Sequence, residues 1–274
     1  MEKSILFSQL KCLTDQIESD IIIQLAGANY YVARKRVGIL TTYNDIGISG
    51  VPDRKRIRKL FTIGLLAGIT VFIGYFILGF RTGDENLTGL EQKLSSYLSM
   101  SDTEIFISAF LGFIGIPLEG LCYFGIYRLI APNSIKWAHV YRSGVLGYLI
   151  FAACGVHVPC LACVYFYKYA VAVSPATAFD DAIKFGMYFL LPGTIAFLIF
   201  FIVQSAAHIF AFAKGLTPYP KWCWIFCMPV GMAMTMLLKF AGNNALASAL
   251  TAAWISIGNI WMFGGLLIMM KKSD

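Results

Sequence analysis

Long stretches without Asp, Glu, Lys or Arg, separated by short charged segments, form the dominant pattern of this 274-residue chain. No charged residue lies between Lys59 and Arg81, and the stretch from Glu104 to Arg128 contains only Glu119. The other uncharged stretches run from Arg142 to Lys168, Lys184 to Lys214, Lys221 to Lys239 and Lys239 to Lys271. Because about 20 apolar residues in a helix cross the hydrocarbon core of a bilayer, the pattern predicts six transmembrane helices. The fold class we expect is an all-α bundle over residues 60–272, in which the fifth span is the shortest.

The composition favours the same interpretation. The chain is 58% hydrophobic and 14% charged, and its mean hydropathy is +0.70. Soluble domains contain about 25% charged residues. The first sixty residues lack the compact apolar run and cleavage site of a signal peptide. We therefore expect a multi-pass membrane protein, for which the lipid bilayer is the first partner.

The charges between the spans predict an orientation. Cationic residues close to span ends stay preferentially in the cytoplasm. Segments 54–59, 128–142 and 214–221 are basic and free of acids, whereas segment 81–104 has five acids against two basic residues. We therefore expect both termini on the cytoplasmic side of the cell membrane. The net charge of +7 follows mostly from this topology and gives little reason to expect a nucleic acid partner.

Two further segments have apolar residues at helical spacing. Residues 1–59 form a distinct amphipathic and basic N-terminal segment, which would lie on the inner membrane surface or pack against the cytoplasmic loops. Segment 83–101 predicts a short surface helix on the outer side. The apolar positions are Leu6, Leu10, Leu13, Ile17 and Ile21 in the first segment, and Leu87, Leu90, Leu94 and Leu98 in the second.

Three stretches resemble an uncharacterised group of bacterial multi-pass membrane proteins. They read "IPLEGLCYFGIYRL", "YRSGVLGYLIFAACGVHVPC" and "KGLTPYPKWCW", and the resemblance covers roughly residues 60–272. It implies a polytopic bundle in a bacterial cytoplasmic membrane and supplies no activity. The chain has no nucleotide-binding loop, H-E-x-x-H motif or nucleophile elbow, so hydrolytic or ATP-driven activity is not indicated. We expect no cofactor, and an enzyme is the less favoured class.

Polar residues near the middle of the spans are the first candidates for function. An ionisable side chain inside the membrane costs about 2.5–3.5 kcal/mol on insertion scales. Glu119 is the only acid in a predicted span, and His157 and Asn259 lie at similar depth in the third and sixth spans. Together they predict a polar pocket that binds, senses or transports a small amphiphilic molecule. The candidate ligand-binding residues are Glu119, Tyr123, His157, Gln204, His208, Trp254 and Asn259. The alternative is that these groups only form hydrogen bonds between helices.

The stretch "ACGVHVPCLAC" in the third span raises two other kinds of chemistry. Successive helical residues turn by about 100°, so its cysteines and histidine point in different directions and cannot surround one metal ion. No metal site is therefore expected. Cys160 and Cys163 form a C-x-x-C pair, which gives the alternative of a membrane thiol or quinone oxidoreductase. A non-catalytic membrane scaffold is the third class of function.

The charge pattern makes a testable prediction about topology. If both termini are cytoplasmic, the cysteine introduced by Lys136→Cys should be protected from a membrane-impermeant thiol reagent in intact cells. The cysteine introduced by Leu90→Cys should be labelled. Labelling of the first position from outside, or protection of the second, would contradict the orientation.

Overall fold

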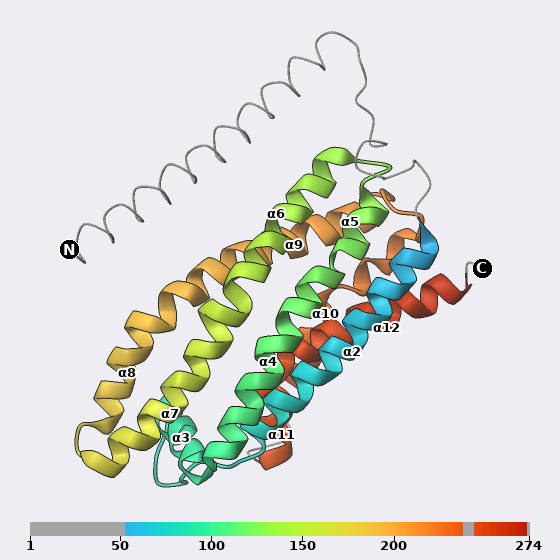
Figure 1. Ribbon diagram of the computed structural model, residues 1–274. Helices are drawn as coiled ribbons and strands as arrows, with labels where there is room; N and C mark the ends of the chain where they lie inside the picture. The colour runs from blue at the N-terminus through green and yellow to red at the C-terminus, as the bar shows by residue number, and fades with distance from the viewer. Residues whose placement is uncertain (1–52, 238–243, 273–274) are drawn as a thin grey trace, which may run out of the picture. The chain divides into compact units, whose positions relative to one another are not determined.

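The computed structural model describes residues 53–237 and 244–272, and within these ranges every regular element is a helix (Figure 1). The all-α fold class is thereby confirmed. The amphipathic helix expected between Leu6 and Ile21 lies outside the described residues. Helix α2 begins at Arg54, so the basic run 54–59 is helical and continuous with the first apolar stretch.

In the described part of the chain, five helical stretches are long and apolar enough to cross a membrane, which fits a membrane protein. They consist of α2 (Arg54–Gly79); α4 (Asp102–Cys122) with α5 (Phe124–Ile130); α6 (Ile135–Phe151) with the π-helical turn η3 (Ala152–His157) and α7 (Val158–Val173); α9 (Leu191–Ala213); and α12 (Trp254–Lys272). Large apolar side chains on the outside of these helices, such as Leu66, Phe106, Ile150 and Ile202, are exposed by 60–67%. An exposed apolar surface of this kind fits contact with lipid.

The predicted fifth span, Lys221 to Lys239, is not confirmed as a transmembrane helix. Its described part contains the 3₁₀ turn η4 (Lys221–Ile225) and helix α10 (Met228–Met236), which has nine residues. At ~1.5 Å per residue, α10 rises by about 14 Å, well short of the ~30 Å hydrocarbon core. Lys239 itself lies outside the described residues. The count of six spanning helices is therefore not confirmed either.

The chain nevertheless passes from one end of the bundle to the other in this region. At the first end, the Asn133 side-chain amide donates to the Leu216 carbonyl over 3.3 Å, which joins the loops after α5 and α9. At the second end, Lys93 of α3 (Gly89–Ser95) donates to Ser248 of α11 (Ala245–Ala252) over 2.8 Å. Figure 1 shows these two ends at opposite extremes of α2 and α4. The segment from Leu216 to Ser248 thus connects them, although no described helix within it has spanning length.

The second end, called the α3 end below, contains α3, the 3₁₀ turn η2 (Ser96–Ser99) and the start of α8 (Ala178–Phe189). Leu94 packs there in one apolar cluster with Tyr167 and Ala178. The short helix predicted in segment 83–101 is therefore present. Lys168, near the end of α7, also pairs with Asp102 at the start of α4 over 2.9 Å, so these two helix ends lie at the same end of the bundle.

Local sequence determines where the helices around the α3 end begin. Ser101 and Glu104 form a capping box at the start of α4, in which the Ser101 hydroxyl accepts from the Glu104 amide and the Glu104 carboxylate accepts from the Ser101 amide. Such reciprocal bonds satisfy two amides that have no partner inside the helix. The same carboxylate pairs with Arg81, just after α2, over 2.7 Å. The ends of α2 and α4 are thereby fixed to each other.

Glycine allows three of the helices to come close. The Ser108 hydroxyl of α4 donates to the Gly74 carbonyl of α2 over 2.9 Å, so the two backbones are nearly in contact. One turn further along α4, a Cβ atom on Gly112 would overlap the imidazole of His157 in η3. Small residues commonly permit such close approach between helices in lipid. The position of His157 therefore depends on the missing side chain at Gly112.

This packing predicts that Gly112→Ala destabilises the protein by about 1–3 kcal/mol, as overpacked buried sites do. Gly264→Ala is the matched control, because the nearest heavy atom to its Cβ would be Leu65 Cδ1 at 3.9 Å. The thermal unfolding midpoint in detergent should fall for the first variant and stay the same or rise for the second. Equal midpoints would contradict the packing described here.

Candidate functional site

Glu119 lies near the end of α4 and is fully buried. Its Oε2 atom accepts a hydrogen bond from the Tyr148 hydroxyl of α6 over 2.9 Å. Its Oε1 atom lies against α2, where a Cβ on Gly68 would be 3.5 Å away. Pro117, two residues before Glu119, lies inside α4. The carboxyl group is thus held between three helices and points away from lipid.

Tyr123, between α4 and α5, links this carboxyl region to α12. Its hydroxyl donates to Asn259 Oδ1 over 2.7 Å and lies 3.2 Å from the Met228 sulfur. Its ring meets the Tyr148 ring edge-on, with centroids 4.9 Å apart. Glu119, Tyr123 and Asn259, three of the residues predicted as a site, are therefore brought into one buried polar layer.

A small cavity of about 30 Å³ adjoins this layer. Glu119 Oε1 and Ser256 Oγ belong to lining residues, are buried, and have no hydrogen-bond partner among the described residues. The lining consists of Val71, Tyr75, Ile116, Glu119, Tyr148, Ala152, Val156, Phe197, Ile255 and Ser256. A cavity of this size has room for one water molecule. It is far too small for an amphiphilic molecule.

His157 is connected to the layer through Tyr75 of α2. Its Nε2 atom lies 3.2 Å and 3.3 Å from the carbonyl oxygens of Ser108 and Ala109, which can only accept hydrogen bonds. Nε2 therefore carries the proton, and Nδ1 accepts from the Tyr75 hydroxyl over 2.9 Å. No hydrogen bond between described side chains joins His157 directly to Glu119 or Asn259.

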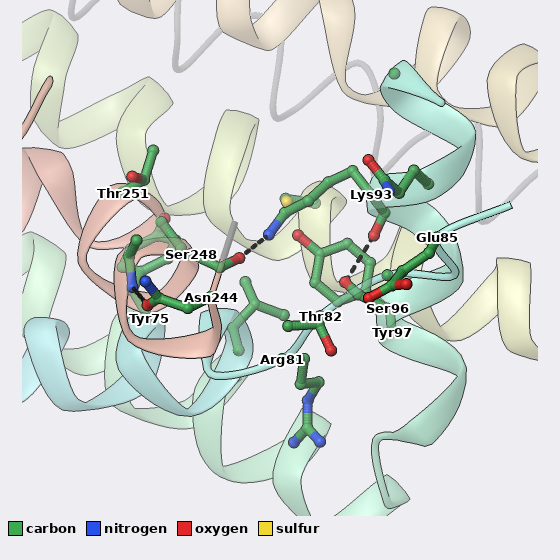
Figure 2. Close-up of a pocket in the computed structure, with 17 residues that line it drawn as sticks. Tyr75, Arg81, Thr82, Glu85, Lys93, Ser96, Tyr97, Asn244, Ser248 and Thr251 are labelled. Atoms are coloured by element: carbon green, nitrogen blue, oxygen red, sulfur yellow. Dashed lines mark hydrogen bonds between the residues drawn. The ribbon is translucent and has the colours of Figure 1, made fainter. Parts of the chain in front are cut away.

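A much larger cavity, of about 800 Å³, opens at the α3 end of the bundle (Figure 2). Its polar side carries Lys93, which donates to Ser248 and lies 5.4 Å from the centroid of the Tyr97 ring. Other lining residues are Tyr75, Leu78, Arg81, Thr82, Gly83, Glu85, Gly89, Gln92, Ser96, Cys160, Asn244, Ala247, Thr251 and Ala252. Tyr75 is the residue that lines both cavities.

The charges around the large cavity are unevenly matched. The guanidinium group of Arg81 pairs with Glu104, whereas no ion pair between described residues involves Lys93. Burial lowers the pKa of the Lys93 ammonium below the ordinary lysine value, because a buried charge loses its hydration. Burial likewise raises the pKa of Tyr97, which keeps its hydroxyl protonated. Lys93 is thus the lining cation without an ion pair to a described residue, and the lining also carries one carboxylate, that of Glu85.

The other predicted site residues lie apart from both cavities. Gln204 and His208 are buried on α9, where Gln204 contacts the Tyr141 hydroxyl at 3.5 Å and His208 meets the Tyr141 ring edge-on. They form a separate polar contact between α6 and α9. Trp254 is the first residue of α12, is partly buried, and lines neither cavity.

The two cysteines of the C-x-x-C pair face different surroundings. Cys160 lines the large cavity, and the Cys163 thiol points to the Ala182 carbonyl of α8 at 3.7 Å. All six cysteines in the described part of the chain are free thiols, and Cys12 lies outside it. Oxidoreductase activity of this pair stays a hypothesis.

Four residues at the two cavities were not predicted from sequence: Tyr75, Lys93, Tyr148 and Ser256. The tyrosines and the serine are uncharged residues within apolar spans, so the pattern of charged and apolar positions does not mark them as site residues. Lys93 did have a signal, because it is the only basic residue between Arg81 and Glu104. That signal was used for topology alone.

Comparison with known proteins identifies the family. The chain belongs to a family of unknown function, DUF6796, whose model matches residues 43–273. No curated protein and no solved structure matches the chain. The family agrees with the resemblance to an uncharacterised group and adds no activity.

The geometry at Glu119 predicts how its substitutions affect stability. Glu119→Gln should leave the unfolding midpoint nearly unchanged, because the amide oxygen still accepts from Tyr148. Glu119→Leu should lower stability by about 1–3 kcal/mol, the cost of an unsatisfied buried hydroxyl. Adding Tyr148→Phe to Glu119→Leu removes that hydroxyl and should restore part of the loss. Strictly additive losses in this double-mutant cycle would show that the Tyr148–Glu119 bond does not stabilise the bundle.

Proposed function

We propose that this member of the family binds a small amphiphilic molecule with an anionic head in the large cavity at the α3 end. The observation that carries the proposal is the combination of a half-buried lysine, which forms no ion pair with a described carboxylate, and an apolar inner wall in one cavity of about 800 Å³. This volume lies within the range of small-molecule sites, about 300–1,000 Å³. The intramembrane polar layer, by contrast, has a cavity of only about 30 Å³.

The polar side of the cavity suits an anionic head. A lysine ammonium has three N–H donors, and the described structure uses one of them on Ser248. The other two are available to a carboxylate or phosphate oxygen. Figure 2 shows Lys93 reaching across the cavity from α3 toward Ser248 of α11, beside Tyr97. Because the Tyr97 hydroxyl stays protonated, it can donate a further hydrogen bond to the same head.

The inner wall of the cavity suits an apolar tail. Leu78 of α2, Ala252 of α11 and Cys160 of α7 line the cavity on the side of the membrane-spanning helices. Leu78 is itself nearly fully buried. With the orientation that the charges predict, the cavity opens on the outer side of the cell membrane. A molecule with its head at Lys93 would then place its tail toward the bundle.

Binding of a fluorescent fatty acid, measured by fluorescence polarisation on the full-length protein in detergent, tests the proposal. Lys93→Gln should weaken the affinity by at least ~10-fold, since hydrogen bonds to charged groups contribute about 1.5–3 kcal/mol. Lys136→Gln removes the same charge from the first turn of α6, at the other end of the bundle, and should change the affinity little. A cationic probe of equal chain length should bind weakly to all three proteins.

The same measurement has a pH dependence. The Lys93 ammonium loses its charge at lower pH than an ordinary lysine, because burial lowers its pKa. Affinity for the anionic probe should therefore be highest at neutral pH and fall as the pH rises, with Lys93→Gln showing no such fall. Equal losses in Lys93→Gln and Lys136→Gln, or no saturable binding at neutral pH, would overturn the proposal.

A further inference from the structure

Glu119 is surrounded by groups that carry no positive charge. Tyr148 faces it from α6, Tyr75 from α2 across the small cavity, and Ser256 and the neutral amide of Asn259 from α12. The other titratable groups near it are Cys122 and Tyr123 on its own segment of chain and His157, which reaches it only through Tyr75. Every ion pair between described residues lies elsewhere. Since an ionised carboxylate without a partner is costly inside a membrane, Glu119 holds a proton in this arrangement.

The free oxygen of the carboxyl group indicates where the proton lies. Oε2 accepts from Tyr148, whereas Oε1 is buried, has no described partner and belongs to the lining of the small cavity. Ser256 Oγ has no described partner either. A proton on Oε1 can be donated to the Ser256 hydroxyl or to one water molecule, for which the cavity has room.

Tyr75 connects this position with the large cavity. Its side chain lines both cavities, and its hydroxyl donates to His157 Nδ1. The Tyr75 oxygen has lone pairs that can accept a proton from a hydronium ion in the large cavity, and it gives up its own proton toward Glu119 once its O–H turns from His157 Nδ1 to the small cavity. The tyrosine is therefore placed to pass a proton between the two cavities.

We propose that Glu119 is a proton-binding site that exchanges its proton with the large cavity by way of Tyr75 and the small cavity. The step is a proton transfer only. An O–H bond forms on Glu119 Oε1 as an O–H bond of a hydronium ion in the large cavity breaks, and no oxidant or reductant takes part.

A metal cation fits the small cavity less well, because hard divalent cations take six or more oxygen ligands. Only Glu119 Oε1 and Ser256 Oγ are without described partners among the lining side chains.

Infrared spectroscopy of the full-length protein in lipid membranes tests this site. The difference between wild type and Glu119→Gln should contain the carbonyl band of a protonated carboxylic acid at neutral pH. In D₂O this band should shift as the proton exchanges. Glu119→Asp should keep a shifted band, which covers the case in which Glu119→Gln fails to fold.

The exchange route has its own matched control. Tyr75→Phe should slow the D₂O shift at least ~10-fold, since the ring stays and the hydroxyl is lost, whereas Tyr97→Phe, which lines only the large cavity, should not. Lys93→Gln should leave the band unchanged, so that failure of the fatty-acid proposal would not affect this one. Four results would overturn the proposal. The band could be absent, or it could be present and never exchange. It could disappear when sodium or magnesium salts are added at constant pH, or Tyr75→Phe and Tyr97→Phe could slow the exchange equally.

Discussion

The burial of one carboxyl group, that of Glu119, constrains most of the bundle's interior. Inside hydrocarbon there is no solvent to satisfy it, so the helices around it must do so. The Tyr148 hydroxyl supplies one hydrogen bond, and the α2 backbone comes close because Gly68 has no side chain in the way. Tyr123 then extends the polar layer to Asn259. Glu119, Tyr148, Tyr123 and Asn259 thus form one buried polar layer that joins the α4 region to α6 and α12, with α2 packed beside it at Gly68.

The irregular turn η3 has a comparable effect on the other side of α4. A π-helical turn shifts the register of a helix by one residue and is frequent at functional sites. Here it ends at His157, the residue whose imidazole sits against Gly112 and bonds to Tyr75. Pro159 comes two residues later and lacks the N–H that a regular helix would use. The sequence around His157 thus favours a local irregularity that aims the imidazole at α4 and α2.

The fold was largely predictable because charge-free stretches have few structural options in a membrane. The stretches from Lys59 to Arg81 and from Lys184 to Lys214 both became spanning helices, α2 and α9. The stretch from Lys221 to Lys239 is also free of charged residues between its ends, but its only described α-helix has nine residues. The absence of charge does not show that Pro229 and the preceding turn interrupt the helix. Glu119, His157 and Asn259 were predicted at one depth; the structure links Asn259 to Tyr123 beside Glu119, whereas His157 bonds to Tyr75. The position of a residue along its span predicts its depth in the membrane but not which neighbouring helix it faces. Gln204 and His208 were therefore included in the predicted site, although they lie between α6 and α9.

The polar layer around Glu119 and the space large enough for a ligand are two different cavities, whereas the sequence predicted a single pocket. A volume of about 30 Å³ beside Glu119 admits a water molecule or a proton, whereas about 800 Å³ beside Lys93 admits an amphiphile. Tyr75 borders both, so a molecule seated against Tyr75 in the large cavity would change the surroundings of the hydroxyl that bonds to His157. Occupancy of the large cavity and protonation of Glu119 then share one side chain, and by thermodynamic linkage each alters the other's binding free energy to the same extent. The single hydroxyl of Tyr75 is thus where a ligand and a proton would influence each other in this bundle.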